Sequence, residues 1–243
     1  WPLALDVVEQ ELTAERAEHR IVGVKWRIND LISAQMDVYD KKFDELLLPN
    51  DFQNFVPFNG GEGYSRGVEI SLQTQPQPED RWHAMLSYSL AKSEYKIMDR
   101  WIPYLHDRRH GLTAMGDARL SHHWSASFTW RYASGLPYYE IHQFVDASDI
   151  HNSFVKNFDD LKRLPYYQRL DIRFNYKFAW KSLACSAYLD LTNVLNRKNI
   201  YDIMWYSLAK DDEEDRDIQI KSLHRRNIFM MPFVPLIGVS FQF

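Results

Sequence analysis

The fold is decided by residues 168–178, which read Gln168-Arg169-Leu170-Asp171-Ile172-Arg173-Phe174-Asn175-Tyr176-Lys177-Phe178, and polar and apolar side chains alternate from Arg169 to Phe178 without a break. A period of two predicts a β-strand with one apolar face. After a short break at 179–182, a second alternating run at 183–191 places Cys185 on its apolar face. Two such strands joined by a tight turn predict an antiparallel hairpin.

The length of these strands indicates their environment. Strands of soluble domains usually stop after about five or six residues, whereas this alternation continues for roughly eleven. At about 3.3 Å per residue and a tilt near 45°, such a strand rises roughly 25 Å, which is the height of the apolar band of an outer-membrane barrel. The hairpin therefore has the length needed to cross a bilayer.

The same alternation recurs along the chain after a mixed, polar stretch at 1–18 that predicts a loop. It predicts nine strands, at 19–28, 32–39, 67–73, 82–90, 110–120, 124–132, 168–178, 183–191 and 237–243. The connections between them are short at 29–30, 76–81, 121–123 and 179–182, and long at 44–63, 94–109, 133–167 and 193–232. Successive antiparallel turns lie at opposite ends of a sheet, so all short turns share one end, as in outer-membrane barrels.

Composition supports a membrane setting and argues against a nucleic-acid partner. The 29 basic residues are interleaved with 33 acidic ones, and no basic run stands out. No apolar run is long enough for a transmembrane helix. Aromatic residues make up 15% of the chain, and we expect them at two interfacial levels. The short-turn level holds Trp82, Trp124, Phe178, Trp180 and Phe243, and the long-loop level holds Tyr64, Trp130, Tyr132, Tyr166, Tyr167 and Phe233.

Four segments in order resemble the C-terminal part of TonB-dependent outer-membrane receptors. They are GYSRGVE at 63–69, RYASGLPY at 131–138, LDLTNVLNR at 189–197 and IGVSFQF at 237–243. The resemblance implies an antiparallel transmembrane β-barrel of 22 strands, of which residues 1–243 form a C-terminal part without the plug domain and the early strands. Nine is an odd number, so the first and last predicted strands run in the same direction and cannot close antiparallel against each other. We therefore expect that this chain does not close a barrel by itself.

The resemblance also implies a function and partners. The whole receptor would lie in the bacterial outer membrane and take up a scarce solute, such as a metal chelate, cobalamin, a glycan or a peptide. Its partners would be the lipid bilayer, the rest of the receptor with its plug, the TonB complex through the N-terminal part, and the barrel-assembly machinery, which would read the terminal Phe243. A surface lipoprotein is a further partner that the resemblance leaves open.

Two other classes stay open on the residues alone. If one strand is miscounted, the chain is a small self-contained barrel, either a porin, an adhesin or an outer-membrane enzyme. A soluble β-sandwich would require the long strands to break near their middles. No nucleophile, base and orienting group can be assembled from the sequence, so a binding or transport protein is favoured over an enzyme, and no cofactor is expected.

Candidate site residues follow from the barrel hypothesis. Polar residues that alternate with the apolar set should face the lumen: Arg131, Arg169, Asp171, Arg173, Lys177 and Asp190. Aromatic residues of the long loops could contact a solute: Trp101, Tyr104, Tyr138, Tyr139 and Phe144. The histidines at 106, 110, 122 and 123 lack the spacing of metal ligands, and the acidic run 211–215 favours a solvated loop over a Ca²⁺ site.

The sorting of the loops generates a test of topology. A protease site inserted at 211–215, in a long loop, should be cut on intact cells. The same site inserted at 179–182, in a short turn, should be cut only after the outer membrane is opened. Immunoblotting of both variants measures this, and the reverse pattern would invert the predicted orientation.

Overall fold

The computed structural model describes residues 12–48, 58–75, 81–97, 99–145, 153–207 and 223–242, and their regular structure is β-strand. The strands are β1 (Arg16–Arg27), β2 (Ile32–Leu48), β3 (Phe58–Thr74), β4 (Trp82–Ile97), β5 (Arg100–Pro103), β6 (His110–Arg119), β7 (Trp124–Ala133), β8 (Pro137–Val145), β9 (Ser153–Arg163), β10 (Tyr167–Trp180), β11 (Leu183–Thr192), β12 (Ile200–Ser207), β13 (Leu223–Phe229) and β14 (Val234–Gln242). Within these ranges, no helix is long and apolar enough to cross a membrane.

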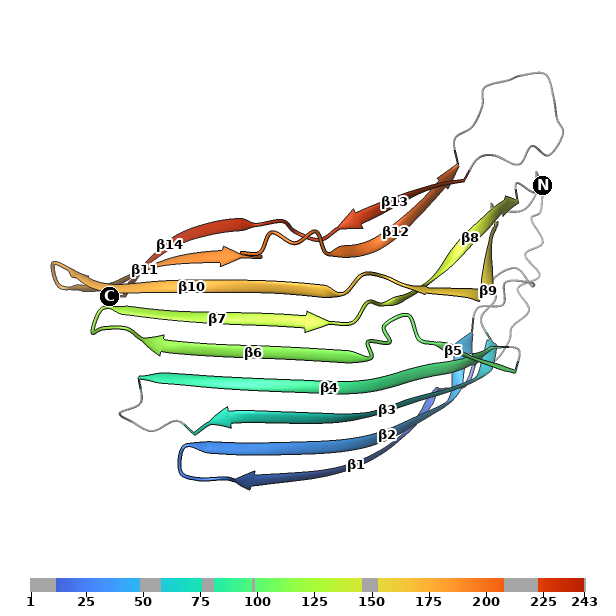
Figure 1. Ribbon diagram of the computed structural model, residues 1–243, viewed down its shortest axis with the longest axis horizontal. Helices are drawn as coiled ribbons and strands as arrows, with labels where there is room; N and C mark the ends of the chain where they lie inside the picture. Colours follow the sequence, from blue (N-terminus) through green and yellow to red (C-terminus); the bar gives the residue numbers. More distant parts are fainter. Residues whose placement is uncertain are drawn as a thin grey trace, which may run out of the picture.

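Nine strands form one antiparallel up-and-down path, in the order β1-β2-β3-β4-β6-β7-β10-β11-β14. They correspond one to one with the nine strands predicted from the alternation. Figure 1 shows the turns β1–β2, β6–β7 and β10–β11 at the left end of this sheet, whereas β5, β8, β9, β12 and β13 lie at the right end. The predicted sorting of short turns and long loops to opposite ends is therefore present in the structure.

The register keeps every predicted apolar set on one face. Apolar residues lie opposite apolar residues from strand to strand, as in Val24–Met36–Ile70–Tyr88–Leu112–Tyr132 and in Ala126–Phe174–Leu189–Ile237. This face is not packed on a core: Val22 is 73% and Ile237 80% exposed. Such a face needs an apolar solvent, because contiguous apolar surface of this extent is unfavourable in water.

Charged side chains mark where the apolar face ends. On β2, β3 and β4 the row Asp40–Arg66–Lys92 follows directly after the apolar rows at the long-loop end. On β4 the apolar alternation runs from Trp82 to Leu90, close to the nine to eleven residues of a tilted transmembrane strand. Exposed tryptophans Trp82, Trp124 and Trp180 lie at the short-turn end. The apolar face is thus a band with an edge at each end.

Several predicted boundaries were wrong in the same direction. The predicted loop at 44–63 is strand at both of its ends, since β2 continues to Leu48 and β3 begins at Phe58, and β1 begins at Arg16 within the predicted N-terminal loop. Predicted loop 94–109 contains the end of β4 and all of β5, and loops 133–167 and 193–232 each contain a hairpin, β8–β9 and β12–β13. Beyond the apolar band, both faces of a strand meet water. The strands there continue to pair through their backbones, but the sequence no longer alternates between apolar and polar residues and so does not indicate a strand.

Asparagine residues in the segment that follows β11 hold the end of that strand in place. Asn193 and Asn196 have positive φ angles of 53° and 46°, a conformation that asparagine tolerates. The Asn193 side chain is buried and its Nδ2 donates to the carbonyls of Arg197 and Met231 at 3.1 and 3.2 Å. Asn199 both accepts from and donates to the backbone of Gln168. These contacts hold the start of β10, the end of β11 and the approach to β14 together, as expected for the segment that ends the penultimate strand.

The register generates a test of which face meets lipid. Phe174 lies opposite Ala126 and Leu189 in the apolar band, whereas Asn175 lies opposite Ser125 and Tyr188 on the polar face. In the membrane-embedded protein, Phe174→Arg should cost roughly 2–4 kcal/mol if it lies near the midplane, while Asn175→Arg should be mild. Equilibrium folding into lipid vesicles measures both, and equal costs would contradict the assignment of faces.

Candidate functional site at the long-loop end

Two of the aromatic residues predicted in the loops, Trp101 and Tyr104, each contact an aromatic side chain at the long-loop ends of β3 and β4. The ring of Trp101, on β5, meets Tyr64 edge to face with centroids 5.0 Å apart. Tyr104, which follows β5, lies 6.3 Å from Tyr95 and 5.4 Å from His106. Trp101 and Tyr104 are still about half exposed, so each keeps part of its ring surface for another contact.

The aromatic residues of β8 have different surroundings. The guanidinium of Arg225, on β13, lies 5.1 Å from the ring centre of Tyr138. Tyr139 is 8% exposed, and burial, together with the nearby Tyr95, raises its pKa to about 12. Tyr139 is therefore a packed residue, while Tyr138 takes part in contacts between hairpins. The side chain of Phe144 lies outside the described residues.

Arg225 also joins the two loop hairpins through other contacts. It lies 3.6 Å from the carboxylate of Glu140 on β8 and 5.9 Å from the ring centre of Trp205 on β12. Glu140 in turn accepts a hydrogen bond from Lys162 on β9 at 2.7 Å. Hairpins β8–β9 and β12–β13 are thereby tied together by one arginine and one carboxylate.

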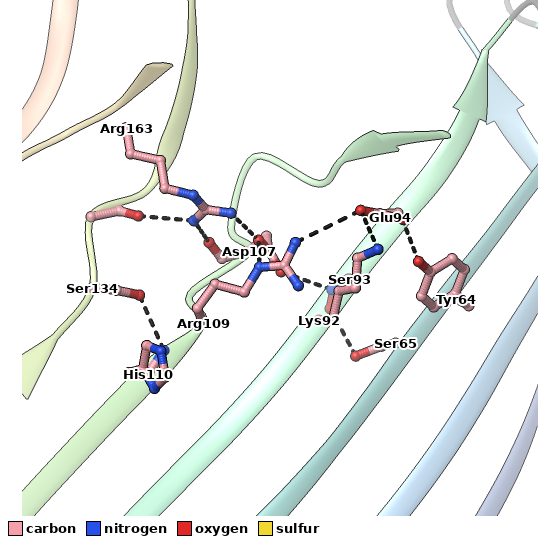
Figure 2. Close-up of polar contacts among 11 residues, drawn as sticks. Tyr64, Ser65, Lys92, Ser93, Glu94, Asp107, Arg109, His110, Ser134 and Arg163 are labelled. Carbon is pink, nitrogen blue, oxygen red and sulfur yellow. Dashed lines mark hydrogen bonds and ion pairs between the residues drawn. The ribbon is translucent and has the colours of Figure 1, made fainter. Parts of the chain in front are cut away.

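A buried carboxylate fixes the loop between β5 and β6 (Figure 2). The side chain of Asp107 is fully buried and lies 2.5 Å from Arg163 Nη2 and 3.1 Å from Arg109 Nε. It also accepts a hydrogen bond from the backbone N–H of Ser93 on β4 at 2.8 Å. Arg163 Nη1 donates to the carbonyls of Asp107 and Gly135. One carboxylate thus holds the loop to β4 and to the end of β9.

Glu94 extends this network along β4, beyond the apolar band (Figure 2). It pairs with Lys92 at 2.8 Å and Arg109 at 3.7 Å, and it accepts a hydrogen bond from the Tyr64 hydroxyl. Burial raises the pKa of Glu94, but these partners outweigh burial and hold it below its ordinary value of 4.5. Because the pKa of Glu94 is lower in the folded protein than in the unfolded chain, its carboxylate stabilises the fold at pH values above the pKa of the unfolded state. This contribution is lost as the pH falls through the pKa of the folded state.

The residues predicted to face the lumen share the polar face of the sheet, opposite the apolar band. Asp171 Oδ1 lies 2.7 Å from Arg169 Nε and accepts the N–H of Asn193, while Oδ2 lies 3.7 Å from Arg131. Arg173 and Asp190 pair at 3.3 Å. Lys177 lies apart from these, near the short-turn end, where its carbonyl contacts His123. That this face lines a lumen stays a prediction.

The sequence did not single out Asp107, Arg163 or Glu94. Asp107 and Arg163 are 56 positions apart, and they meet because β6, β7 and β10 are successive neighbours in the sheet, which brings the loop before β6 close to the end of β9. A charged residue in a loop carries no local signal of such a partner. Within the described ranges, no three His, Cys, Asp or Glu side chains gather closely enough to hold a metal ion.

The Asp107 network generates a test of local stability. Asp107→Ala should remove the carboxylate that Arg109 and Arg163 share and leave the Ser93 N–H without its acceptor, so exchange of the Ser93 amide hydrogen should accelerate roughly tenfold or more. The matched control is Asp99→Ala, because Asp99 is 95% exposed and pairs only with Lys96 among the described residues. Hydrogen exchange read by mass spectrometry measures both, and an unchanged Ser93 rate would show that the carboxylate does not fix the loop.

Comparisons with known proteins agree with this arrangement. The family model described as TonB dependent receptor-like, beta-barrel matches residues 6–194. Among solved structures, the closed form of the ferric-catecholate import receptor Fiu from E. coli K12 is similar, with a TM-score of 0.53 and 15% identity, covering 94% of this chain and 28% of that receptor. No curated protein matches the sequence. The chain belongs to the β-barrel family of TonB-dependent receptors.

Proposed function

We propose that this chain is part of the barrel wall of an outer-membrane receptor that takes up a scarce solute by energised transport. The observation that carries the proposal is the two-faced sheet of nine strands, apolar on one side and charged on the other, in a chain of this receptor family. The apolar band fits the bilayer of the outer membrane, where receptors of this family reside. The charged face fits a water-filled or plugged interior.

The remainder of the receptor would supply what this chain does not. The chain corresponds in length to 28% of the similar receptor, so the other strands, the plug and the segment that contacts the TonB complex are assigned to other parts of the protein. Strands β1 and β14 stand at the two ends of the path and need partner strands, because unpaired backbone groups are costly in hydrocarbon. Assembly would depend on the barrel-assembly machinery, which acts on the C-terminal strand.

The solute class stays open between a metal chelate, cobalamin, a glycan and a peptide. The exposed ring surfaces of Trp101 and Tyr104, together with Tyr138, suit a ligand with flat or apolar faces. Similarity to Fiu at 15% identity concerns the fold alone, so a ferric catecholate is one candidate among these classes.

Uptake assays in the native bacterium test this proposal. Cells that carry the full-length receptor should accumulate one labelled solute from the four classes faster than cells in which the gene is deleted. A protonophore, or inactivation of the TonB complex, should abolish this difference, because the energy arrives from the inner membrane. Receptor-dependent uptake that persists without TonB would instead indicate a passive porin.

A further inference from the structure

The polar face of the sheet contains a recess of about 240 Å³ at its long-loop half, formed by β4, β6, β7 and the start of β10. The register places Ser87, Thr113 and Arg131 in one row and Ser89, Gly111 and Tyr167 in the next. Arg108, from the loop before β6, and Leu112, Tyr132 and Ala133 complete the lining. The recess thus combines two arginines with three serine or threonine hydroxyl groups.

Arg108 has no counter-charge among the described residues. Its guanidinium lies 5.4 Å from the ring centre of Tyr167, and burial lowers its pKa. Arg131 lies 3.7 Å from Asp171, but that carboxylate already pairs with Arg169 at 2.7 Å. Glu69, opposite Ser89 on β3, does not line the recess. A half-buried cation is costly to leave unpaired, so positive charge in this recess favours an anionic occupant.

The backbone at Arg108 is held by the residues on either side of it, Asp107 and Arg109, which Figure 2 shows. Asp107 is held by Arg163 and the Ser93 N–H, and the carbonyl of Arg109 accepts a hydrogen bond from the N–H of Ala91. The backbone on both sides of Arg108 is therefore anchored to β4. A cation held in place before its ligand arrives binds that ligand with less loss of conformational entropy.

Space in the recess depends on a glycine. A Cβ added at Gly111 would lie 2.6 Å from Ser89 Oγ, so an alanine there would push into the floor of the recess without changing any charge. The hydroxyls of Ser87, Ser89 and Thr113 have no hydrogen-bond partner among the described residues, and each can donate to an oxygen atom. Guanidinium and hydroxyl donors together match the oxygens of a carboxylate or phosphate group.

We propose that this recess binds a carboxylate or phosphate group of the solute that the receptor takes up. A small solute is favoured over a protein side chain because the recess is larger than one carboxylate and opens on the long-loop half of the polar face, from which an entering solute arrives. That the bound anion belongs to a transported solute rests on the proposed function. That the recess binds an anion does not.

Binding of defined anions to the purified full-length receptor tests the proposal. Citrate and inorganic phosphate, titrated by calorimetry at constant ionic strength, serve as carboxylate and phosphate probes, and the one that binds more tightly names the class. Arg108→Gln should weaken that binding about tenfold, and Gly111→Ala should weaken it to a similar extent with the charge retained. Arg173→Gln, which removes an arginine already paired with Asp190 on the same face, should change it less than about twofold.

Lack of binding of either probe, or equal affinities in all variants, would overturn the proposal. Labelling of unmutated receptor with phenylglyoxal, mapped by mass spectrometry, adds a readout that does not depend on folding of a variant. Arg108 should be labelled without probe and protected by the bound anion. If Arg108 resists labelling without probe while Arg173 reacts, another part of the receptor supplies the counter-charge and the proposal is wrong. Anion binding without TonB-dependent uptake would contradict the proposed function and leave the recess site intact.

Discussion

Backbone amides and carbonyls inside hydrocarbon have no water to bond, so each must find its partner on a neighbouring strand. This requirement fixes the antiparallel register of the nine-strand path, and the register in turn decides which side chains meet lipid. A slip of one residue would exchange the two faces of a strand, placing Arg173 in the apolar band and Phe174 on the charged side. The pairing of apolar with apolar residues on neighbouring strands, from Val24–Met36 on β1 and β2 to Leu189–Ile237 on β11 and β14, follows from this constraint.

Beyond the charged row Asp40–Arg66–Lys92, backbone groups can bond to water and need no partner on a neighbouring strand. Side-chain hydrogen bonds and ion pairs hold the loops in place there. Asp107 accepts from two arginines and one backbone N–H, and Asn193 donates to two carbonyls. Both are short polar side chains with little rotamer entropy to lose, and both are buried, so their hydrogen bonds are shielded from competing water.

How far the sequence predicts this structure depends on whether the two faces of a strand differ. Residues 168–178 were sufficient to locate β10, because apolar and charged side chains alternate there for the full width of the band. The residues from Asp40 to Leu48 continue β2 with both faces wet, and their alternation no longer separates strand from loop. The pair Asp107–Arg163 depends on how two loops fold over neighbouring strands, which no local pattern reports. The LDLTNVLNR segment was recognised as a motif, yet the hydrogen bonds that explain it appear only with the fold.

Charge pairing within the polar face has a consequence for what that face can bind. Arg169 with Asp171 and Arg173 with Asp190 neutralise each other in the plane of the sheet, so they present dipoles more than net charge to whatever lies above them. Such a surface can contact water or a polar partner, but it binds neither strongly. Arg108 differs because it comes from an anchored loop and has no counter-charge among the described residues. Most charges on the polar face are paired, so we expect selective binding of a charged ligand where loop residues such as Arg108 add an unpaired charge to that face.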